Sequence, residues 1–252
     1  MMNNDPISLR TPPYLLNKSR GLVFMLLLAL LLGGTSLAYA EPRQGEITKQ
    51  CRIKVPGGKQ NREKITDRKY MTSWQSGKGN KASLTITLPE GVRQGGIYIT
   101  WDKTPESWTL RQGEDIIQQS DDNAFAHVHM PFEGGQPLHL EIKAPKGKPF
   151  GVGELFVYAG ETPGWVQQWQ PTQPRADLLV LVAHPDDELL FMGGAIPYYQ
   201  HEKGKQVVVS YMTCANGMRR SEMLNGLWEM GVRHYPVIGG FRDVSAKSMD
   251  RM

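Results

Sequence analysis

The sequence predicts an all-β sandwich followed by an incomplete doubly wound α/β sheet. Three observations lead to this prediction. Between residues 83 and 158, short apolar runs alternate with polar residues at a period of two and are separated by Gly and Pro clusters. From residue 176 onward, strand-like and helix-like segments alternate instead. Ahead of both parts lies an apolar stretch, residues 21–32, that is typical of an export signal.

Residues 1–40 are predicted to be a secretory signal peptide. Lys18 and Arg20 precede the apolar stretch, and Ala38-Tyr39-Ala40 provides a small-x-small cleavage site. An uncleaved anchor is the alternative, because about 20 residues are enough to span a bilayer. In both cases the remaining chain is placed outside the cytoplasm, either secreted or extracytoplasmic. A membrane would be contacted only through this segment, if it is uncleaved.

The charge of the chain gives no reason to expect a nucleic-acid partner. The formal net charge is +4, from 29 Lys and Arg against 25 Asp and Glu, and the basic residues form no long run. The Lys and Arg residues scattered over 43–82 are interpreted as a solvated face. The two cysteines, Cys51 and Cys214, fall in different predicted domains, so they do not indicate a disulfide framework.

Residues 41–160 are predicted to form the β-sandwich. Leu84, Ile86 and Leu88 alternate with polar residues, as in a half-buried strand. Further β-rich runs cover residues 97–101, 108–110, 126–130, 138–142 and 155–158. The run from Ser83 to Leu110 resembles galactose-binding-like, discoidin-type jelly rolls. This resemblance implies sugar binding at the tips of loops.

Some side chains of the sandwich allow two interpretations. Tyr98, Trp101 and Trp108 could stack on sugar rings, or they could be core aromatics, since aromatic residues mostly supply buried area. His127 and His129 lie two residues apart on one face of a strand, as two metal ligands could. Such a pair is more commonly the polar side of a half-buried strand.

The α/β part begins after a predicted linker, residues 161–175, that contains prolines and glutamines without a period. The continuous apolar run over residues 178–183 predicts a parallel strand that is covered on both faces. A helix, a strand, a helix and a strand are then predicted over residues 187–203, 207–212, 219–230 and 235–238. Residues 176–252 would therefore form a doubly wound sheet, in which ligands bind beyond the carboxyl ends of the strands.

A histidine and three acids stand at the carboxyl end of the first of these strands. His184 and Asp187 are three residues apart across a turn that Pro185 stiffens, so both side chains can converge on one ion. One nitrogen and one carboxylate oxygen suit Zn²⁺ or another divalent metal. Asp186 lies between them and could hold the attacking water as a general base. Alternatively, the acids are only the first-turn acids of a helix, which the helix dipole favours. That alternative leaves the adjoining histidine unexplained.

The motif Ala183-His184-Pro185-Asp186-Asp187-Glu188 resembles the signature of the LmbE/PIG-L family of zinc-dependent de-N-acetylases, which act on N-acetylglucosaminyl compounds. Residues 212–217, 219–222 with 230–232, and 238–243 are similar to further elements of that family, in the same order. The similarity covers about residues 176–243. It implies a zinc-dependent amide hydrolase whose substrate is an N-acetylated sugar or glycan.

The resemblance also implies a role for each matching residue. His184 and Asp187 would be metal ligands, and Asp186 would be the general base. Arg219 and Asp243 would face the substrate sugar. For Arg219 the alternative is an exposed helix pair with the acid three residues later, worth a few tenths of a kcal/mol.

The chain departs from the family pattern further downstream. The third ligand of the family is a histidine in a His-x-x-His-type motif, and the only histidines after His184, namely His201 and His234, are not in such a motif. We therefore expect this chain to be an incomplete form, a truncated product or a fragment, that holds a metal weakly. The alternative function is a non-enzymatic extracytoplasmic carbohydrate-binding protein with a remnant deacetylase segment.

Overall fold

The computed structural model describes residues 43–55, 61–69, 71–77, 81–120, 125–214 and 216–243. The predicted signal peptide, residues 1–40, lies outside these ranges. Among the residues that are described, no helix has the length and apolar character needed to cross a membrane.

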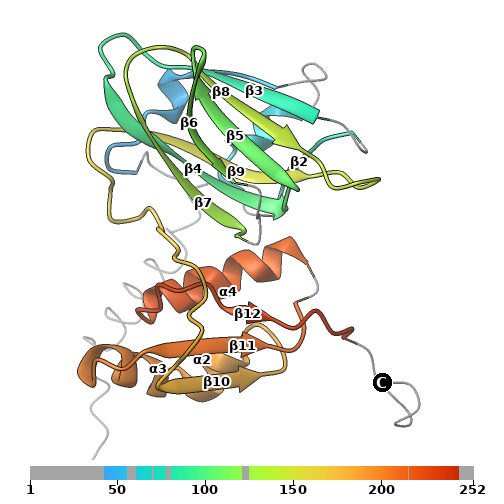
Figure 1. Cartoon of the computed structure of the whole chain (residues 1–252), viewed down its shortest axis with the longest axis vertical. Helices are drawn as coiled ribbons and strands as arrows, with labels where there is room; N and C mark the ends of the chain where they lie inside the picture. The colour runs from blue at the N-terminus through green and yellow to red at the C-terminus, as the bar shows by residue number, and fades with distance from the viewer. Residues whose placement is uncertain are drawn as a thin grey trace, which may run out of the picture. The chain divides into compact units, whose positions relative to one another are not determined.

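Two antiparallel sheets build the β-sandwich (Figure 1). One sheet has the strand order β1-β3-β8-β5-β6, and the other has the order β2-β9-β4-β7. The strands are β1 (Arg52–Lys54), β2 (Trp74–Gln75), β3 (Lys81–Thr87), β4 (Gln94–Lys103), β5 (Ser107–Gln112), β6 (Asp115–Ser120), β7 (His127–Glu133), β8 (Leu138–Lys143) and β9 (Gly151–Ala159). Two short 3-10 helices, η1 (Thr48–Gln50) and η2 (Arg62–Ile65), precede the second strand. The predicted all-β sandwich is confirmed.

The alternation of apolar and polar residues along the strands explains how the two sheets pack together. In β3, Leu84 and Ile86 point into the core and are fully buried, while Lys81 and Thr87 are exposed. Apolar residues from the inner faces of both sheets join them in one cluster. This cluster is the main hydrophobic core of the described chain, and its burial is the main force that holds the two sheets together.

The aromatic side chains considered for sugar stacking are buried instead. Trp101 and Trp108 are 2% and 4% exposed and belong to the core between the sheets. Tyr98 is 3% exposed and packs with Phe156 on the outer face of its sheet, in a smaller cluster. Of the two interpretations of these three residues, the structure therefore supports buried aromatics and not a sugar-stacking surface.

A three-stranded parallel sheet follows, with the order β10-β11-β12. Its elements are β10 (Leu178–Val182), α2 (Asp187–Met192), α3 (Ala195–Pro197), the π-helical turn η3 (Tyr198–Glu202), β11 (Val207–Tyr211), α4 (Gly217–Glu229) and β12 (Val237–Ile238). The predicted alternation of strands and helices is thus present. The single helix predicted over residues 187–203 is wrong, because α2 ends at Met192. Two glycines follow there, and glycine is a poor helix former.

The two faces of the parallel sheet differ. Val180 and Val209 pack in one core with Leu224 of α4 and Ile196 of α3. On the opposite face of β10, Leu179 and Leu181 are more than half exposed. A doubly wound sheet carries helices on both faces, and the described residues do not show this arrangement. The doubly wound fold therefore stays a prediction.

A buried hydrogen-bond network joins β7, the predicted linker and α4. Gln167 Oε1 accepts a hydrogen bond from the Trp169 indole at 2.9 Å and lies 2.9 Å from Nδ1 of His127. The His127 Nδ1 therefore carries the proton, because the oxygen facing it can only accept. Nε2 of His127 then accepts a hydrogen bond from the Ser221 hydroxyl, 2.8 Å away. The predicted linker is thus packed into the structure.

Acid should weaken this network. Burial lowers the pKa of His127 to about 4, against the opposing effect of its hydrogen bond to Gln167. Because the folded-state pKa lies below the ordinary value of about 6.5, the stabilisation is complete above pH 6.5 and is lost as the pH falls toward 4. In the wild type, His127 should lower the free energy of unfolding by on the order of 3 kcal/mol as the pH falls from 6.5 toward 4. We expect His127→Gln to abolish this decrease. Urea unfolding at several pH values measures it.

His201→Gln is the control, since His201 is exposed. Equal pH dependence of unfolding in the wild type and in His127→Gln would contradict this account of the network.

Candidate functional site

The carboxyl ends of the three parallel strands bring together all the residues that the sequence predicts for the site. His184 follows β10, Asp186 and Asp187 lie at the start of α2, Arg219 is in the first turn of α4, and Asp243 follows β12. Side-chain contacts of 3.2 to 3.6 Å connect His184 with Asp187 and Asp243, and Asp186 with Arg219. The two groups are adjacent because Asp186 and Asp187 are neighbours in the sequence. In parallel sheets this edge is where ligands bind.

The imidazole of His184 lies between two carboxylates. Its Nδ1 is 3.6 Å from Oδ2 of Asp187, and its Nε2 is 3.2 Å from Oδ1 of Asp243. Oδ2 of Asp187 also accepts a hydrogen bond from the backbone N–H of His184 at 2.9 Å, which fixes that carboxylate across the turn. All three side chains are partly exposed, so a ligand can reach them.

Asp186 forms an ion pair with Arg219. The Arg219 guanidinium donates to Oδ2 of Asp186 at 3.2 Å. The position of Arg219 follows from how α4 begins, because the side chain of the N-cap residue Asn216 accepts a hydrogen bond from the Arg219 backbone N–H at 2.9 Å. In this structure Arg219 therefore contacts Asp186, in addition to any contact with a substrate.

The backbone of Asp186 is strained. Its φ of 118° lies in a region that side-chain-bearing residues rarely adopt, and such conformations cost about 1–3 kcal/mol. Its N–H donates to Oε2 of Glu188 at 3.0 Å, and its carbonyl accepts from Leu190 at 2.9 Å. Glu188 is buried, and burial raises the pKa of its carboxyl while the Asp186 N–H opposes this. The motif sequence gives no sign of this strain.

The donor atoms fit a divalent metal in part. The 3.6 Å between His184 Nδ1 and Asp187 Oδ2 is close to the roughly 3.4 Å expected between two donors that each lie ~2.1 Å from a tetrahedral zinc ion. Zinc sites use three or four protein ligands. The described ranges contain no group of three or more His, Cys, Asp or Glu side chains arranged to hold a metal ion. A metal bound by His184 and Asp187 would therefore have only two ligands from the described residues.

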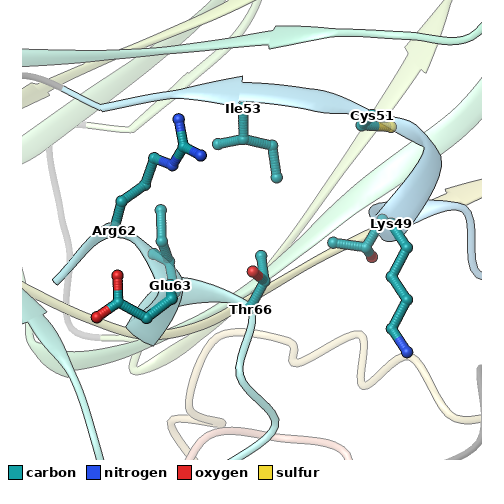
Figure 2. A pocket seen from close by; sticks show the side chains of 8 residues that line it. Lys49, Cys51, Ile53, Arg62, Glu63 and Thr66 are labelled. Carbon is teal, nitrogen blue, oxygen red and sulfur yellow. The ribbon is translucent and has the colours of Figure 1, made fainter. Parts of the chain in front are cut away.

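A second feature is a cavity of about 470 Å³ in the sandwich, between β1 and η2 (Figure 2). Its lining consists of Thr48, Lys49, Cys51, Ile53, Arg62, Glu63, Ile65 and Thr66. From the sequence, the basic residues of this region are expected on a solvated face, and the cavity is not predicted. They are scattered along the chain, and only the fold shows that the two segments enclose a space.

Solved structures with similarity to part of this chain include carbohydrate-binding modules and an F5/8 type C domain. A CBM32 module (CpGH89CBM32-6) of Clostridium perfringens is 17% identical, with a TM-score of 0.38, over 45% of this chain and 97% of its own. Chitosan-binding module 1 of a Paenibacillus chitosanase/glucanase is 12% identical, with a TM-score of 0.37, over 46% and 96%. An F5/8 type C domain from Bacteroides fragilis is 11% identical, with a TM-score of 0.36, over 47% and 97%.

No family model and no curated protein matches the chain. The LmbE/PIG-L resemblance consequently rests on the sequence motifs alone.

Relief of the strain at Asp186 should stabilise the protein. Glycine adopts positive φ without a steric cost, although it loses more conformational entropy on folding. We expect Asp186→Gly to raise the free energy of unfolding by about 1 kcal/mol. Chemical denaturation measures this change.

Asp187→Gly is the matched control, because Asp187 has no positive φ, so glycine there relieves no strain and removes the hydrogen bond from the His184 N–H. If Asp186→Gly destabilised the protein as much as Asp187→Gly, the backbone of Asp186 would not be strained.

Proposed function

We propose that this chain is a carbohydrate-directed amide hydrolase that removes the N-acetyl group from an N-acetylglucosamine-containing glycan or glycoconjugate. The observation that carries the proposal is the gathering of His184, Asp186, Asp187, Arg219 and Asp243 at one edge of the parallel sheet. These residues come from three separate segments of the sequence. A helix-capping role for the acids alone would not require the histidine or Asp243. The predicted signal segment implies that the site works outside the cytoplasm.

In this proposal each residue has a defined task. His184 and Asp187 would hold a divalent metal, which would polarise the carbonyl of the amide as a Lewis acid. Asp243 accepts a hydrogen bond from Nε2–H of His184, and this contact fixes the ring and leaves Nδ1 free to ligate. Asp186 takes a proton from the attacking water. Arg219 keeps the Asp186 carboxylate in place.

Water is the second reactant of the hydrolysis. The water oxygen bonds to the carbonyl carbon, and its proton passes to Asp186. The carbon–nitrogen bond then breaks, and the proton held by Asp186 can pass to the departing nitrogen. The products are acetate and a free amino sugar.

The second candidate function is carbohydrate binding without catalysis. The observation that favours it is the cavity between β1 and η2, which combines hydroxyl, charged and apolar side chains in the sandwich. Polar groups placed around an apolar wall are typical of small-ligand sites. This function needs nothing from the His184 cluster, which consists of His184, Asp186, Asp187, Arg219 and Asp243.

Acetate release separates the two functions. The full chain with zinc should release acetate from N-acetylglucosamine oligomers, and Asp186→Ala should lower the rate about 100-fold or more, because general-base catalysis contributes at least that much. His184→Ala and Asp187→Ala should weaken zinc binding in calorimetric titrations. Asp115→Ala, an exposed carboxylate in β6, is the control.

If no acetate is released with zinc present and Asp186→Ala behaves like the wild type, the hydrolase proposal fails. Retained binding of glycans in that case would favour the second candidate.

A further inference from the structure

The cavity between β1 and η2 lies in the sandwich and is lined by none of the residues of the His184 cluster (Figure 2). We propose that it binds a hexuronate, the acidic sugar unit of a glycan, through the sugar's carboxylate. The inference rests on the carbohydrate-directed function proposed above. It adds the chemical class of the sugar and the residues that recognise it.

The size and lining of the cavity suit one sugar ring. Its volume of about 470 Å³ falls in the range of roughly 300–1,000 Å³ that is common for small-ligand sites. Ile53 and Ile65 supply apolar contact for the C–H face of a pyranose ring. Thr48 and Thr66 add hydroxyls that could hydrogen-bond to the polar rim of the ring.

The two segments that form the cavity are strongly basic. Residues 48–55 and 61–66 contain five basic residues and one acidic residue, Glu63. The basic residues are Lys49, Arg52, Lys54, Arg62 and Lys64. Lys49 and Arg62 line the cavity itself, whereas Arg52 and Lys54 alternate with Ile53 along β1 and lie on the opposite face of the strand, close to the cavity. The resulting positive potential attracts an anionic ligand over a neutral one.

Arg62 is available to bind a carboxylate. Within the described ranges, its side chain makes no hydrogen bond or ion pair, and neither does that of Lys49. Arg68 differs, since it is paired with Glu46 and Glu154. Figure 2 shows the Arg62 side chain reaching toward Ile53, while the Glu63 carboxylate points the other way. A guanidinium binds a carboxylate with two parallel hydrogen bonds, which favours a uronate over a neutral hexose.

Cys51 contributes a neutral group to the cavity. Its thiol is half-buried, and burial raises its pKa to about 11. A protonated thiol is neither a good nucleophile nor a metal ligand. The thiol therefore adds no negative charge to the cavity.

Titration of the ¹⁵N-labelled full chain with D-glucuronate and with D-glucose tests the inference. We expect glucuronate to shift the amide resonances of Cys51, Ile53 and Thr66, and to bind roughly tenfold or more tightly than glucose, because the charge-assisted bonds need the carboxylate. Binding should weaken as salt is raised, since the cations are exposed. Acetate, which carries the charge without the ring, should bind more weakly than glucuronate.

Arg62→Ala should weaken glucuronate binding roughly tenfold without moving the melting temperature. Arg175→Ala is the matched control, since Arg175 is also exposed and lies in the segment between the sandwich and β10.

Three results would overturn the inference. Equal binding of glucose and glucuronate, unaffected by Arg62→Ala, would remove the uronate preference but leave carbohydrate binding intact. Glucuronate binding that survives Arg62→Ala would place the ligand elsewhere. No binding of either sugar by a chain that releases acetate would reject this cavity while the hydrolase proposal stands.

Discussion

The parallel pairing of β10 with β11 is the interaction on which the His184 cluster depends. The register runs from Leu178 opposite Val207 to Val182 opposite Tyr211. Hydrogen bonds continue beyond the strands, because Met212 and Thr213 donate to the carbonyls of Val182 and Ala183, each at 3.0 Å. The Phe241 N–H then donates to Met212 at 3.0 Å. These bonds hold the segment before His184 and the segment before Asp243 at one edge, so their side chains can meet.

The elements with a clear hydrophobic period could be predicted from the sequence, and the others could not. Alternation at Leu84 and Ile86 marks β3 because one face of that strand is buried. The edge strand β6 was missed, since its consecutive Ile116 and Ile117 are both exposed and produce no alternation. α2 ends just before Gly193. This end could not be predicted, because a glycine weakens a helix without always ending it.

The members of the His184 cluster could be named from the sequence because metal and base chemistry restrict the residue types. The contacts between these side chains could not be predicted from the sequence. The Arg219–Asp186 ion pair depends on how α4 is oriented relative to the turn after β10, and the φ of Asp186 is set by the turn itself. The cavity was missed for a similar reason, because Lys49 and Arg62 lie in separate segments that only the folded sandwich brings together.

The central claim is that His184 and Asp187 hold a divalent metal beside Asp186. Anomalous diffraction from crystals of the full chain grown with zinc tests it most directly. The account predicts an anomalous peak within about 2.3 Å of His184 Nδ1 and of an Asp187 carboxylate oxygen. A crystal that contains zinc at other positions, with no peak at these two side chains, would contradict it.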